Sequence, residues 1–407
     1  MEKVAYVMSR FPKLTETFIL YEIIALEKQG IKVEIFPLLR EHAKTIHKEA
    51  QELTERAHFH PFISAKILAA HWSFIRRDFR TYFKTIAEVF SGTFGSLNFF
   101  VGALGILPKA VRFAYEMEQL GVQHVHAHFA THPAVAGLII NRLTGIPFSF
   151  TAHGSDLHVE KRMLDKKIRL ACFATTVSFF NKELMVREAG EETREKIHVL
   201  RCGVDTKLFS PCEKKAEGRP FQILCVASFE EVKGHKYLVD ACKILSDKGL
   251  DFECHFVGYG PLQNQIENQI GELGLQGKFH IHGGLPRNRV LEMLLKSDVF
   301  VLASVPTRQG KREGVPVVLM EAMASGLPVI SSQLSGIPEL VDHEVSGILT
   351  EPGDTDALAR ALLDLAADPA KKISFGRAGR EKVLSEFDLE KNTLKLLDLL
   401  KVFSVTH

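Results

Sequence analysis

The chain has 407 residues, of which 46% are hydrophobic and 25% charged, and its formal net charge is +2. This length is long for a single hydrophobic core, so we expect two domains. The ordinary composition and the near-neutral charge do not favour a nucleic-acid partner or a disordered protein.

The six cysteines are scattered along the chain without a CxxC pair. This spacing argues against a zinc finger or a disulfide framework and indicates reduced thiols, as found in the cytoplasm. The N-terminus lacks the pattern of a signal peptide, and the longest apolar stretch, 97–108, is expected to be too short to span a bilayer. We therefore expect a cytoplasmic protein.

The N-terminal segment predicts a strand at 4–8, a helix at 17–29 and a second strand at 31–38. This order is typical of a doubly wound parallel sheet, whose ligands bind beyond the carboxyl ends of the strands. The first turn contains no glycine, which excludes a nicotinamide-type fingerprint. In that turn, Lys13 or Arg10 could meet a phosphate group, or both could be ordinary surface charges.

Residues 62–120 mix aromatic side chains with lysine and arginine. Helices with apolar faces and basic flanks can lie on an anionic membrane surface. They can equally be core helices that cover a sheet and keep their charges in solvent. We favour the core packing.

Three histidines alternate on a predicted strand at 122–129, so His124, His126 and His128 share one face. Three histidines on one strand could bind a metal, but no carboxylate or cysteine nearby completes the ligand set, and we expect no metal site here. His128 lies at the carboxyl end of the strand, closest to the edge where ligands bind.

A second histidine position follows the buried strand at 146–152, which ends in His153-Gly154-Ser155-Asp156. A histidine at the carboxyl end of a strand faces the ligand crevice of a doubly wound sheet, although it could also be a structural residue that caps the turn. Asp156 could cap the following helix or line an acceptor site.

A polar, turn-rich stretch at 210–220 predicts a linker, after which a second set of strands and helices begins. Lys233 and Gly234 follow its first strand. Gly258 and Gly260 follow its second strand and form half of a dinucleotide fingerprint, which is a weak motif.

The stretch 300–332 predicts a buried strand, a basic loop and a helix at 317–325. Pro316, directly before this range, is expected at the first position of the helix. Free N–H groups near Gly314 and Val315, together with the helix dipole, predict a pocket for a phosphate-sized anion.

Two glutamates lie beside this predicted pocket. Glu321 has apolar and small neighbours, so we expect it to be buried, where a carboxylate needs hydrogen-bond donors such as sugar or ribose hydroxyls. Alternatively, Glu313 is a simple helix N-terminal acid and Glu321 is held by a basic side chain.

Seven residues separate Glu313 from Glu321 in REGVPVVLMEAMASGLPVI, and SGIPELV follows at 335–341. This stretch resembles the EX7E signature of glycosyltransferase family 4, whose members are retaining enzymes with the GT-B fold. The loop SRFPKLTETF at 9–18 resembles the first loop of the exopolysaccharide or colanic-acid-type subgroup.

The resemblance implies an α/β fold of two doubly wound Rossmann-like domains that face each other across a cleft. Residues 1–208 would form the acceptor-binding domain, and residues 219–387 would bind the nucleotide-sugar. The last helix, about 388–407, would pack back on the first domain.

The resemblance also implies the roles of individual residues. His153 and Glu313 would be catalytic. The donor would be bound by Lys233, Gly258, Gly260, Arg312, Gly314, Val315 and Glu321, and the acceptor side would include Lys13, His128 and Asp156.

The family's G-R-x3–4-K-G loop is matched at Lys233 and Gly234, but Ser228 stands where the arginine is expected. A serine cannot grip a phosphate bidentately, so Arg312, Lys311 or Arg308 would have to supply the charge. No Asp-x-Asp pair is found. We therefore expect a metal-independent site without cofactors, in which fixed cations and N–H groups meet the diphosphate of a UDP-sugar or GDP-sugar.

The expected function is the transfer of a hexose-type sugar to a glycan or polyprenyl-linked acceptor with retention of anomeric configuration. The expected location is the cytoplasm, with peripheral contact at the inner face of the plasma membrane. Two alternatives stay open: a nucleotide-sugar epimerase on the same fold, and a non-catalytic partner subunit, for which the serine at 228 is the best argument.

Overall fold

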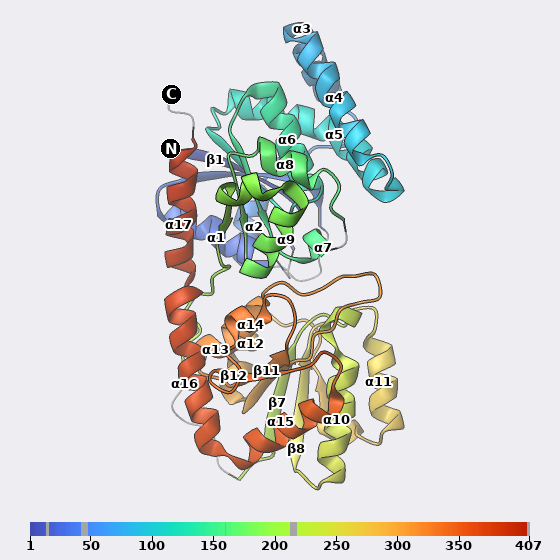
Figure 1. Ribbon diagram of the computed structural model, residues 1–407, viewed down its shortest axis with the longest axis vertical. Coiled ribbons are helices and arrows are strands. Elements are labelled where there is room, and N and C mark those ends of the chain that lie inside the picture. The colour runs from blue at the N-terminus through green and yellow to red at the C-terminus, as the bar shows by residue number, and fades with distance from the viewer. Residues whose placement is uncertain (14–15, 42–47, 159, 212–217, 405–407) are drawn as a thin grey trace. The chain divides into compact units, whose positions relative to one another are not determined.

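The computed structural model describes residues 1–13, 16–41, 48–158, 160–211 and 218–404. The chain divides into two compact units (Figure 1). The first unit comprises Met1–Arg201 together with Thr393–His407, and the second comprises Cys202–Asn392. Part of the expected linker, 212–217, and the last three residues of the expected final helix lie outside the described residues.

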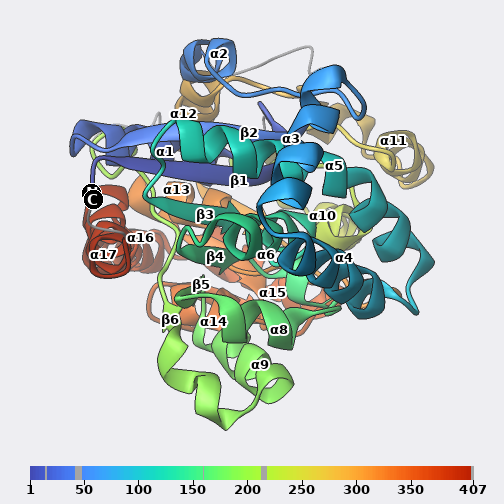
Figure 2. The same ribbon diagram turned by 90° about the horizontal axis from the view of Figure 1, so that it is seen from above.

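The first unit contains a parallel sheet of six strands in the order β2-β1-β3-β4-β5-β6, as Figure 2 shows from above. Its strands are β1 (Lys3–Phe11), β2 (Lys32–Arg40), β3 (His124–His128), β4 (Phe148–Ala152), β5 (Phe173–Thr176) and β6 (Ile197–Val199). Its helices are α1 (Thr17–Lys28), α2 (Lys48–Glu55), α3 (Ala65–Arg77), α4 (Phe79–Thr93), α5 (Leu97–Gln119), α6 (His132–Thr144), α7 (Ser155–His158), α8 (Leu164–Leu170) and α9 (Phe179–Ala189), with the 3-10 helix η1 (Glu191–Lys196).

The strand order reverses at β1, which pairs with β2 on one side and β3 on the other. In a doubly wound sheet this switch point opens a crevice at the carboxyl edge. β1 is longer than the predicted strand at 4–8, because its pairing with β2 continues to Phe11 opposite Arg40.

The first sheet is covered on both faces, which explains why its central strands are apolar almost throughout. One core cluster joins the sheet to α5 and α6, and includes Phe113, Ile139 and Phe148. A separate cluster contains α1 residues together with Leu396 and Leu400. These leucines belong to α17 (Leu389–Val402), so the C-terminal helix completes the core of the first unit.

Helices α3, α4 and α5 carry the aromatic and basic segment. Their inner faces are buried, with Phe74, Tyr82 and Phe99 as examples, so one face of each helix packs into the core of the first unit. The helix that contains the apolar stretch 97–108 continues to Gln119, because it tolerates Pro108 at the loss of one backbone hydrogen bond.

By length and composition, α5 is the one helix in the described part of the chain that could cross a membrane, so the prediction that this stretch is too short was wrong. α5 nevertheless packs along α6. The side chains of Phe113, Ala114 and Met117 are fully buried, as in a core helix.

The second unit contains a parallel sheet in the order β12-β11-β10-β7-β8-β9. Its strands are β7 (Phe221–Val226), β8 (Phe252–Val257), β9 (Phe279–Ile281), β10 (Val299–Leu302), β11 (Val329–Ser332) and β12 (Gly347–Thr350). Its helices are α10 (His235–Asp247), α11 (Gln263–Glu272), α12 (Arg287–Lys296), α13 (Val317–Ala324), α14 (Ile337–Leu340), α15 (Thr355–Ala367) and α16 (Pro369–Glu386), with the 3-10 helices η2 (Glu231–Lys233) and η3 (Gln276–Lys278). Here the order reverses between β7 and β10.

Candidate active site

Lys233 and Glu313 form an ion pair at the carboxyl edge of the second sheet. Lys233 follows β7 and Glu313 follows β10, the two neighbouring strands that flank the switch point. Gly234 permits the loop after β7 to lie close to the residue that follows β10. Its φ is +68°, and a Cβ there would lie 1.7 Å from the carbonyl oxygen of Ala303. Lys233 Nζ lies 2.7 Å from Glu313 Oε1. The pair therefore occupies the position where a doubly wound sheet binds its ligand.

A second ion pair joins the same two loops. Lys311 Nζ lies 2.5 Å from Glu230 Oε2, and Ser228 Oγ donates a 3.2 Å hydrogen bond to Glu230 Oε1. Burial raises the pKa of Glu230, but the hydrogen bond and charge of Lys311, the hydrogen bond from Ser228 and the charge of Lys233 together lower it by more, so the pKa lies below its ordinary value. Ser228 and Lys311 thus both hold this acid.

Arg312 lies in the loop between β10 and α13. Its side chain is partly exposed, and within the described ranges no ion pair to it is found. Arg308 is exposed. Of the three residues that could replace the missing arginine, Lys311 is therefore already paired with Glu230. Arg312 can offer its charge to a ligand.

The N-terminus of α13 follows this loop directly. The helix begins at Val317, and Pro316 is its N-cap residue rather than its first helical residue, which corrects the prediction. The reason is the backbone of Pro316, whose ψ of 123° is extended. Among the described residues no side chain caps this end. Its first N–H groups, beside the partly buried Gly314 and the buried Val315, are suited to an anion.

Glu321 lies on α13 with 8% of its surface exposed, as the sequence predicts. Burial raises the pKa of Glu321 to about 7, and the positive charge of Arg287 opposes this shift. No hydrogen bond to the Glu321 carboxylate is found among the residues that the structure describes. A buried carboxylate of this kind lacks donors and would gain from ligand hydroxyls.

Gly258 and Gly260 have a packing reason for being glycine. Gly258 has φ +143°, and a Cβ would lie 2.0 Å from the carbonyl oxygen of Ala227. A Cβ on Gly260 would lie 2.6 Å from the carbonyl oxygen of Phe229. The turn after β8 therefore rests directly on the loop after β7, and it supports the backbone that leads to Lys233.

In the first unit, His128 and His153 lie next to each other at the carboxyl edge. His128 Nδ1 is 3.1 Å from His153 Nε2, and the two rings are stacked. His128 is fully buried, and burial lowers its pKa to about 3. Burial also lowers the pKa of His153 well below its ordinary value. Both imidazoles are therefore neutral near pH 7.

The carboxylate of Asp156 accepts hydrogen bonds from the backbone. Its Oδ1 accepts hydrogen bonds from the N–H groups of His153 and Gly154, and its Oδ2 accepts one from the N–H of Ala130. Asp156 therefore holds the turn before α7 and the loop after β3, and these hydrogen bonds are not the predicted cap of the following helix. Lys13 is on the neighbouring loop, where its Nζ lies 2.6 Å from the carboxylate of Glu16.

Both halves of the chain match known family models. Residues 15–208 match the model described as Glycosyltransferase Family 4, and residues 210–382 match the model described as Glycosyl transferases group 1. The chain belongs to glycosyltransferase family 4.

Among curated relatives of this family 4 chain is an amylovoran biosynthesis glycosyltransferase of Erwinia amylovora, 41% identical over 194 residues, or 48% of each chain. A protein named for colanic acid biosynthesis in Escherichia coli (strain K12) is 39% identical over 209 residues, which is 51% of this chain and 52% of that one. The matched part spans about half the length of these relatives.

Solved structures show the same fold. A glycosyltransferase from Rickettsia africae ESF-5 has a TM-score of 0.72 at 18% identity, with 99% of this chain and 98% of that chain covered. Anabaena HepE in complex with UDP also has a TM-score of 0.72, at 16% identity, with 99% and 100% covered. The expected GT-B class with two Rossmann-like domains is confirmed.

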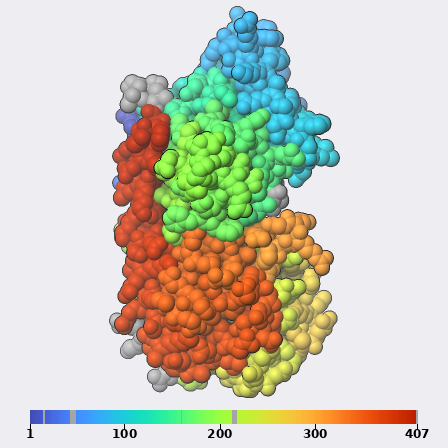
Figure 3. Space-filling model, in the orientation of Figure 1, coloured from blue at the N-terminus to red at the C-terminus, as the bar shows by residue number. Residues whose placement is uncertain are grey.

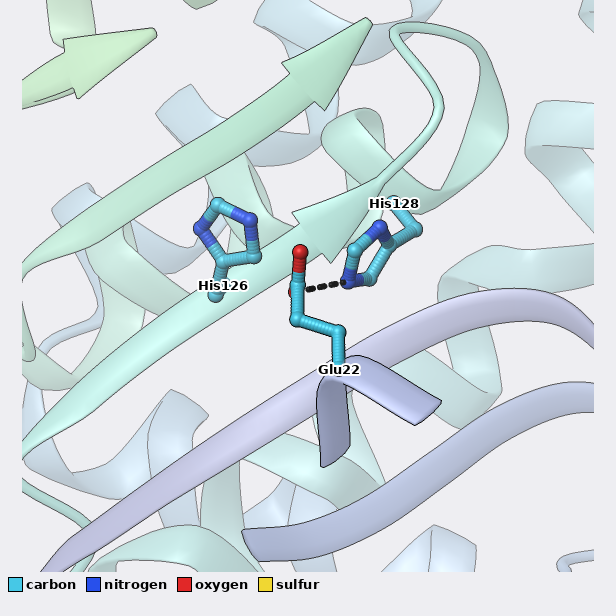
Figure 4. A group of neighbouring side chains, drawn as sticks. All are labelled: Glu22, His126 and His128. Atoms are coloured by element: carbon cyan, nitrogen blue, oxygen red, sulfur yellow. Dashed lines mark ion pairs between the residues drawn. The ribbon is translucent and has the colours of Figure 1, made fainter. Parts of the chain in front are cut away.

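The sequence prediction missed two residues of the family 4 first domain. Tyr6 OH donates a 2.6 Å hydrogen bond to Glu22 Oε1. His128 Nε2 lies 3.3 Å from the same oxygen, a contact that Figure 4 shows. The premise that no carboxylate lies near the strand histidines was therefore wrong: possible ligand atoms of Glu22, His126 and His128 all lie within 4.8 Å of one another. A signal was present, because Glu22 interrupts the apolar helix TFILYEIIALEK.

Proposed function

We propose that this chain transfers a hexose-type sugar from a UDP-sugar or GDP-sugar to a glycan or polyprenyl-linked acceptor in exopolysaccharide synthesis, with retention of configuration. The observation that carries the proposal is the Lys233–Glu313 pair at the switch point, beside the uncapped N-terminus of α13. A cation and free N–H groups at this position suit the diphosphate of a nucleotide-sugar.

Donor binding exchanges partners in the second domain. Lys233 leaves Glu313 for the diphosphate, and Arg312 supplies the charge that Ser228 cannot. Glu313, once released, accepts hydrogen bonds from the sugar hydroxyls. Glu321, buried and without a hydrogen-bond donor among the described residues, takes the two ribose hydroxyls as its donors.

The chemical step needs no metal in this proposal. The bond between the anomeric carbon and the diphosphate oxygen breaks while the acceptor oxygen bonds to the same face of that carbon. The acceptor proton passes to a leaving phosphate oxygen. Lys233, Arg312 and the α13 N–H groups stabilise the charge that develops on the leaving group, and His153 contacts the transferred sugar.

We further propose that the first domain meets an anionic membrane surface from the cytoplasmic side. Large apolar side chains are exposed on α3–α5 and the segment before them: Phe62, Ile63, Leu68, Trp72, Phe79, Phe83, Phe94, Leu97, Val101 and Leu104. Residues 62–104 also carry five cations and two acids. Figures 1 and 3 show α3 and α4 extending from the rest of the first unit.

The pairs Leu68–Trp72, Phe79–Phe83 and Leu97–Val101 are each four residues apart, so both members lie on one face of their helix. Exposed apolar faces with basic flanks are what an interfacial helix presents to lipid. Such a surface would bring the enzyme to a polyprenyl-linked acceptor.

The function is tested with a panel of UDP- and GDP-sugars, with and without polyprenyl-diphosphate-sugar acceptors, read by mass spectrometry. We expect an acceptor product whose anomeric configuration, measured by NMR, equals that of the donor. Lys233→Ala should abolish it. Lys371→Ala is the matched control, because Lys371 is paired in the same unit with 22% of its side chain exposed, against 21% for Lys233.

Two other outcomes would replace the proposal. A changed nucleotide-sugar formed without acceptor would identify an epimerase. A folded protein that binds no nucleotide-sugar of the panel would identify a non-catalytic subunit. In such a subunit, the contacts among Ser228, Glu230 and Lys311 would replace phosphate binding by the loop after β7.

A further inference from the structure

Three side chains of the kinds that bind metal ions meet inside the first unit. Glu22 belongs to α1, and His126 and His128 extend from one face of β3. One possible ligand atom of each lies within 4.8 Å of the other two, and Figure 4 shows the carboxylate of Glu22 between the two imidazole rings. Two histidines and one glutamate form a ligand set that Zn²⁺ uses in proteins, with a fourth position left to water.

Two atoms of this group lack the partner that their chemistry requires. The His128 side chain is fully buried, and within the described ranges its Nε2 atom makes no hydrogen bond. In the same part of the chain no lysine or arginine pairs with the Glu22 carboxylate, whose one ion-pair contact is with His128. A buried nitrogen without a hydrogen bond and a carboxylate without a cation both cost free energy. A divalent cation between them would satisfy both.

The separation of these two atoms fits a shared ion. Ligand atoms that bind Zn²⁺ at about 2.0–2.1 Å in a tetrahedron are about 3.4 Å apart. Glu22 Oε1 and His128 Nε2 are 3.3 Å apart. The ligand atom of His126 lies within 4.8 Å of both, so at most a small rotation of this side chain brings it into the same tetrahedron. The side chain of Glu22 is 20% exposed, which gives an ion a path from solvent.

The ligands also have the outer partners that metal sites usually show. Ligating histidines and carboxylates are commonly held by further hydrogen bonds, which fix the orientation of the ligand. Tyr6 OH donates a 2.6 Å hydrogen bond to Glu22 Oε1. On the far side of the His128 ring, Nδ1 lies 3.1 Å from His153 Nε2. Both ligands are therefore oriented from behind, with the facing atoms directed at each other.

His126 has to give up one hydrogen bond in order to bind an ion. Its Nδ1 lies 2.8 Å from Ser149 Oγ, and its Nε2 lies 2.9 Å from Thr151 Oγ1. Each of these hydroxyl groups has a second partner: Ser149 Oγ lies 2.7 Å from His124 Nε2, and Thr151 Oγ1 lies 2.6 Å from Thr175 Oγ1. The hydroxyl that loses His126 thus stays hydrogen-bonded, and the other nitrogen keeps its outer partner.

The competing interpretation is a polar cluster that needs no ion. The Tyr6–Glu22 hydrogen bond and the two hydroxyl contacts of His126 are compatible with it. It leaves the buried Nε2 atom of His128 without a hydrogen bond, however, although that atom faces a carboxylate. A bound cation accounts for this atom, and the polar cluster alone does not.

We propose that Glu22, His126 and His128 bind one Zn²⁺ ion, which fastens α1 to β3. The inference goes beyond the proposed function, because the ion is structural and takes no part in the transfer of the sugar. It joins the helix that follows the first strand to the strand on the other side of the switch point, so it holds together the two elements that flank the ligand edge of the first sheet.

The site is tested on the purified full-length chain, which is stripped of metal and then titrated with Zn²⁺ alone in competition with a chromogenic chelator. We expect one tight site per chain. Tyr6→Phe keeps all three ligands and should weaken zinc binding by about 10- to 100-fold, the usual effect of losing an outer partner. Glu22→Gln removes a ligand and should weaken binding more than Tyr6→Phe does. X-ray absorption of the zinc-loaded parent should show nitrogen and oxygen ligands that include two imidazoles.

His255→Ala is the matched control, because His255 belongs to the other close group of histidines, where its Nδ1 lies 3.0 Å from His282 Nε2. This variant should bind zinc like the parent. Zinc binding that His255→Ala abolishes and Glu22→Gln preserves would overturn the inference in favour of an adventitious ion in the second unit. A sulfur shell in the absorption spectrum would assign the ion to cysteines, and a folded parent without a tight site would leave the polar cluster; either result overturns the inference.

Thermal unfolding gives a second readout. Zinc should raise the unfolding temperature of the parent and of His255→Ala, and it should not raise that of Glu22→Gln, because an ion that binds only the folded chain stabilises it. An equal rise in Glu22→Gln and the parent would contradict the site. If Glu22→Gln does not fold, Tyr6→Phe and the absorption spectrum of the parent decide. No sugar is present in these measurements, so a chain that binds zinc at this site but transfers no sugar would refute the proposed function alone.

Discussion

Glu313 Oε1 lies 2.7 Å from Lys233 Nζ, so a ligand that approaches either side chain also meets the charge of the other. The two residues come from loops on either side of the second-sheet switch point. Because the diphosphate is anionic, it competes with Glu313 for the ammonium group of Lys233.

This competition predicts opposite effects of two substitutions on the binding of UDP or GDP. Lys233→Ala should weaken binding by about 10- to 100-fold, the loss of a charge-assisted hydrogen bond. Glu313→Gln should leave binding equal or tighter, because the competing charge is gone, and should still lose sugar transfer. Isothermal titration calorimetry measures both. Equal weakening by the two variants would refute the exchange of partners.

The raised pKa of Glu321 predicts that the free energy of unfolding depends on pH. Burial raises its folded-state pKa to about 7, so the folded protein binds this proton more tightly than the unfolded chain does. The contribution to stability is present below the unfolded-state pKa, near 4, and is lost as the pH rises through about 7. Glu321→Gln should therefore unfold at higher urea concentration than the parent at pH 8 but not at pH 4.5, with a gain of roughly 3 kcal/mol at most. A difference that does not depend on pH would contradict the burial argument.

Gly234→Ala tests the close approach that places Lys233. The added Cβ would meet the Ala303 carbonyl at a positive φ, and we expect a loss of at least about 3 kcal/mol in unfolding free energy. Gly249→Ala is the control, because Gly249 has φ +79° and open space around it. It should cost only about 1–2 kcal/mol. Similar urea unfolding curves for the two variants would show that the contact is unimportant.

Asp156→Ala separates the two interpretations of this residue. Three backbone N–H groups would lose their acceptor inside the protein, so we expect a destabilisation of about 3 kcal/mol. Asp78→Ala, at the exposed N-cap of α4, should destabilise the protein clearly less than Asp156→Ala does. If Asp156 instead bound the acceptor, its variant would keep its stability and raise only the acceptor KM.

The membrane proposal predicts sedimentation of the protein with vesicles that contain phosphatidylglycerol, and weaker binding in high salt. The double variant Trp72→Ser/Phe79→Ser should bind about tenfold more weakly or worse, because two exposed apolar side chains are lost. Ile373→Ser, at an equally exposed apolar position of the second unit, should bind like the parent. Equal binding of the double variant and the parent would remove α3 and α4 from the contact.

The amino-acid sequence by itself determined the alternation of strands and helices, the glycine turns at strand ends and the spacing of Glu313 and Glu321. These features depend on neighbours within a few residues, because helix and strand periodicity and turn chemistry are local. The burial of Glu321 was predictable for the same reason: its apolar neighbours on α13 mark a buried helix.

The tertiary structure alone decided which distant groups meet. Glu22 on α1 reaches His128 on β3, and Lys311 reaches Glu230, 81 residues away, because the order of the strands brings these elements and loops together. The same holds for Asp156, whose carboxylate binds the backbone of another loop. No periodicity in a single chain encodes such pairings, since they arise only when separate elements pack together.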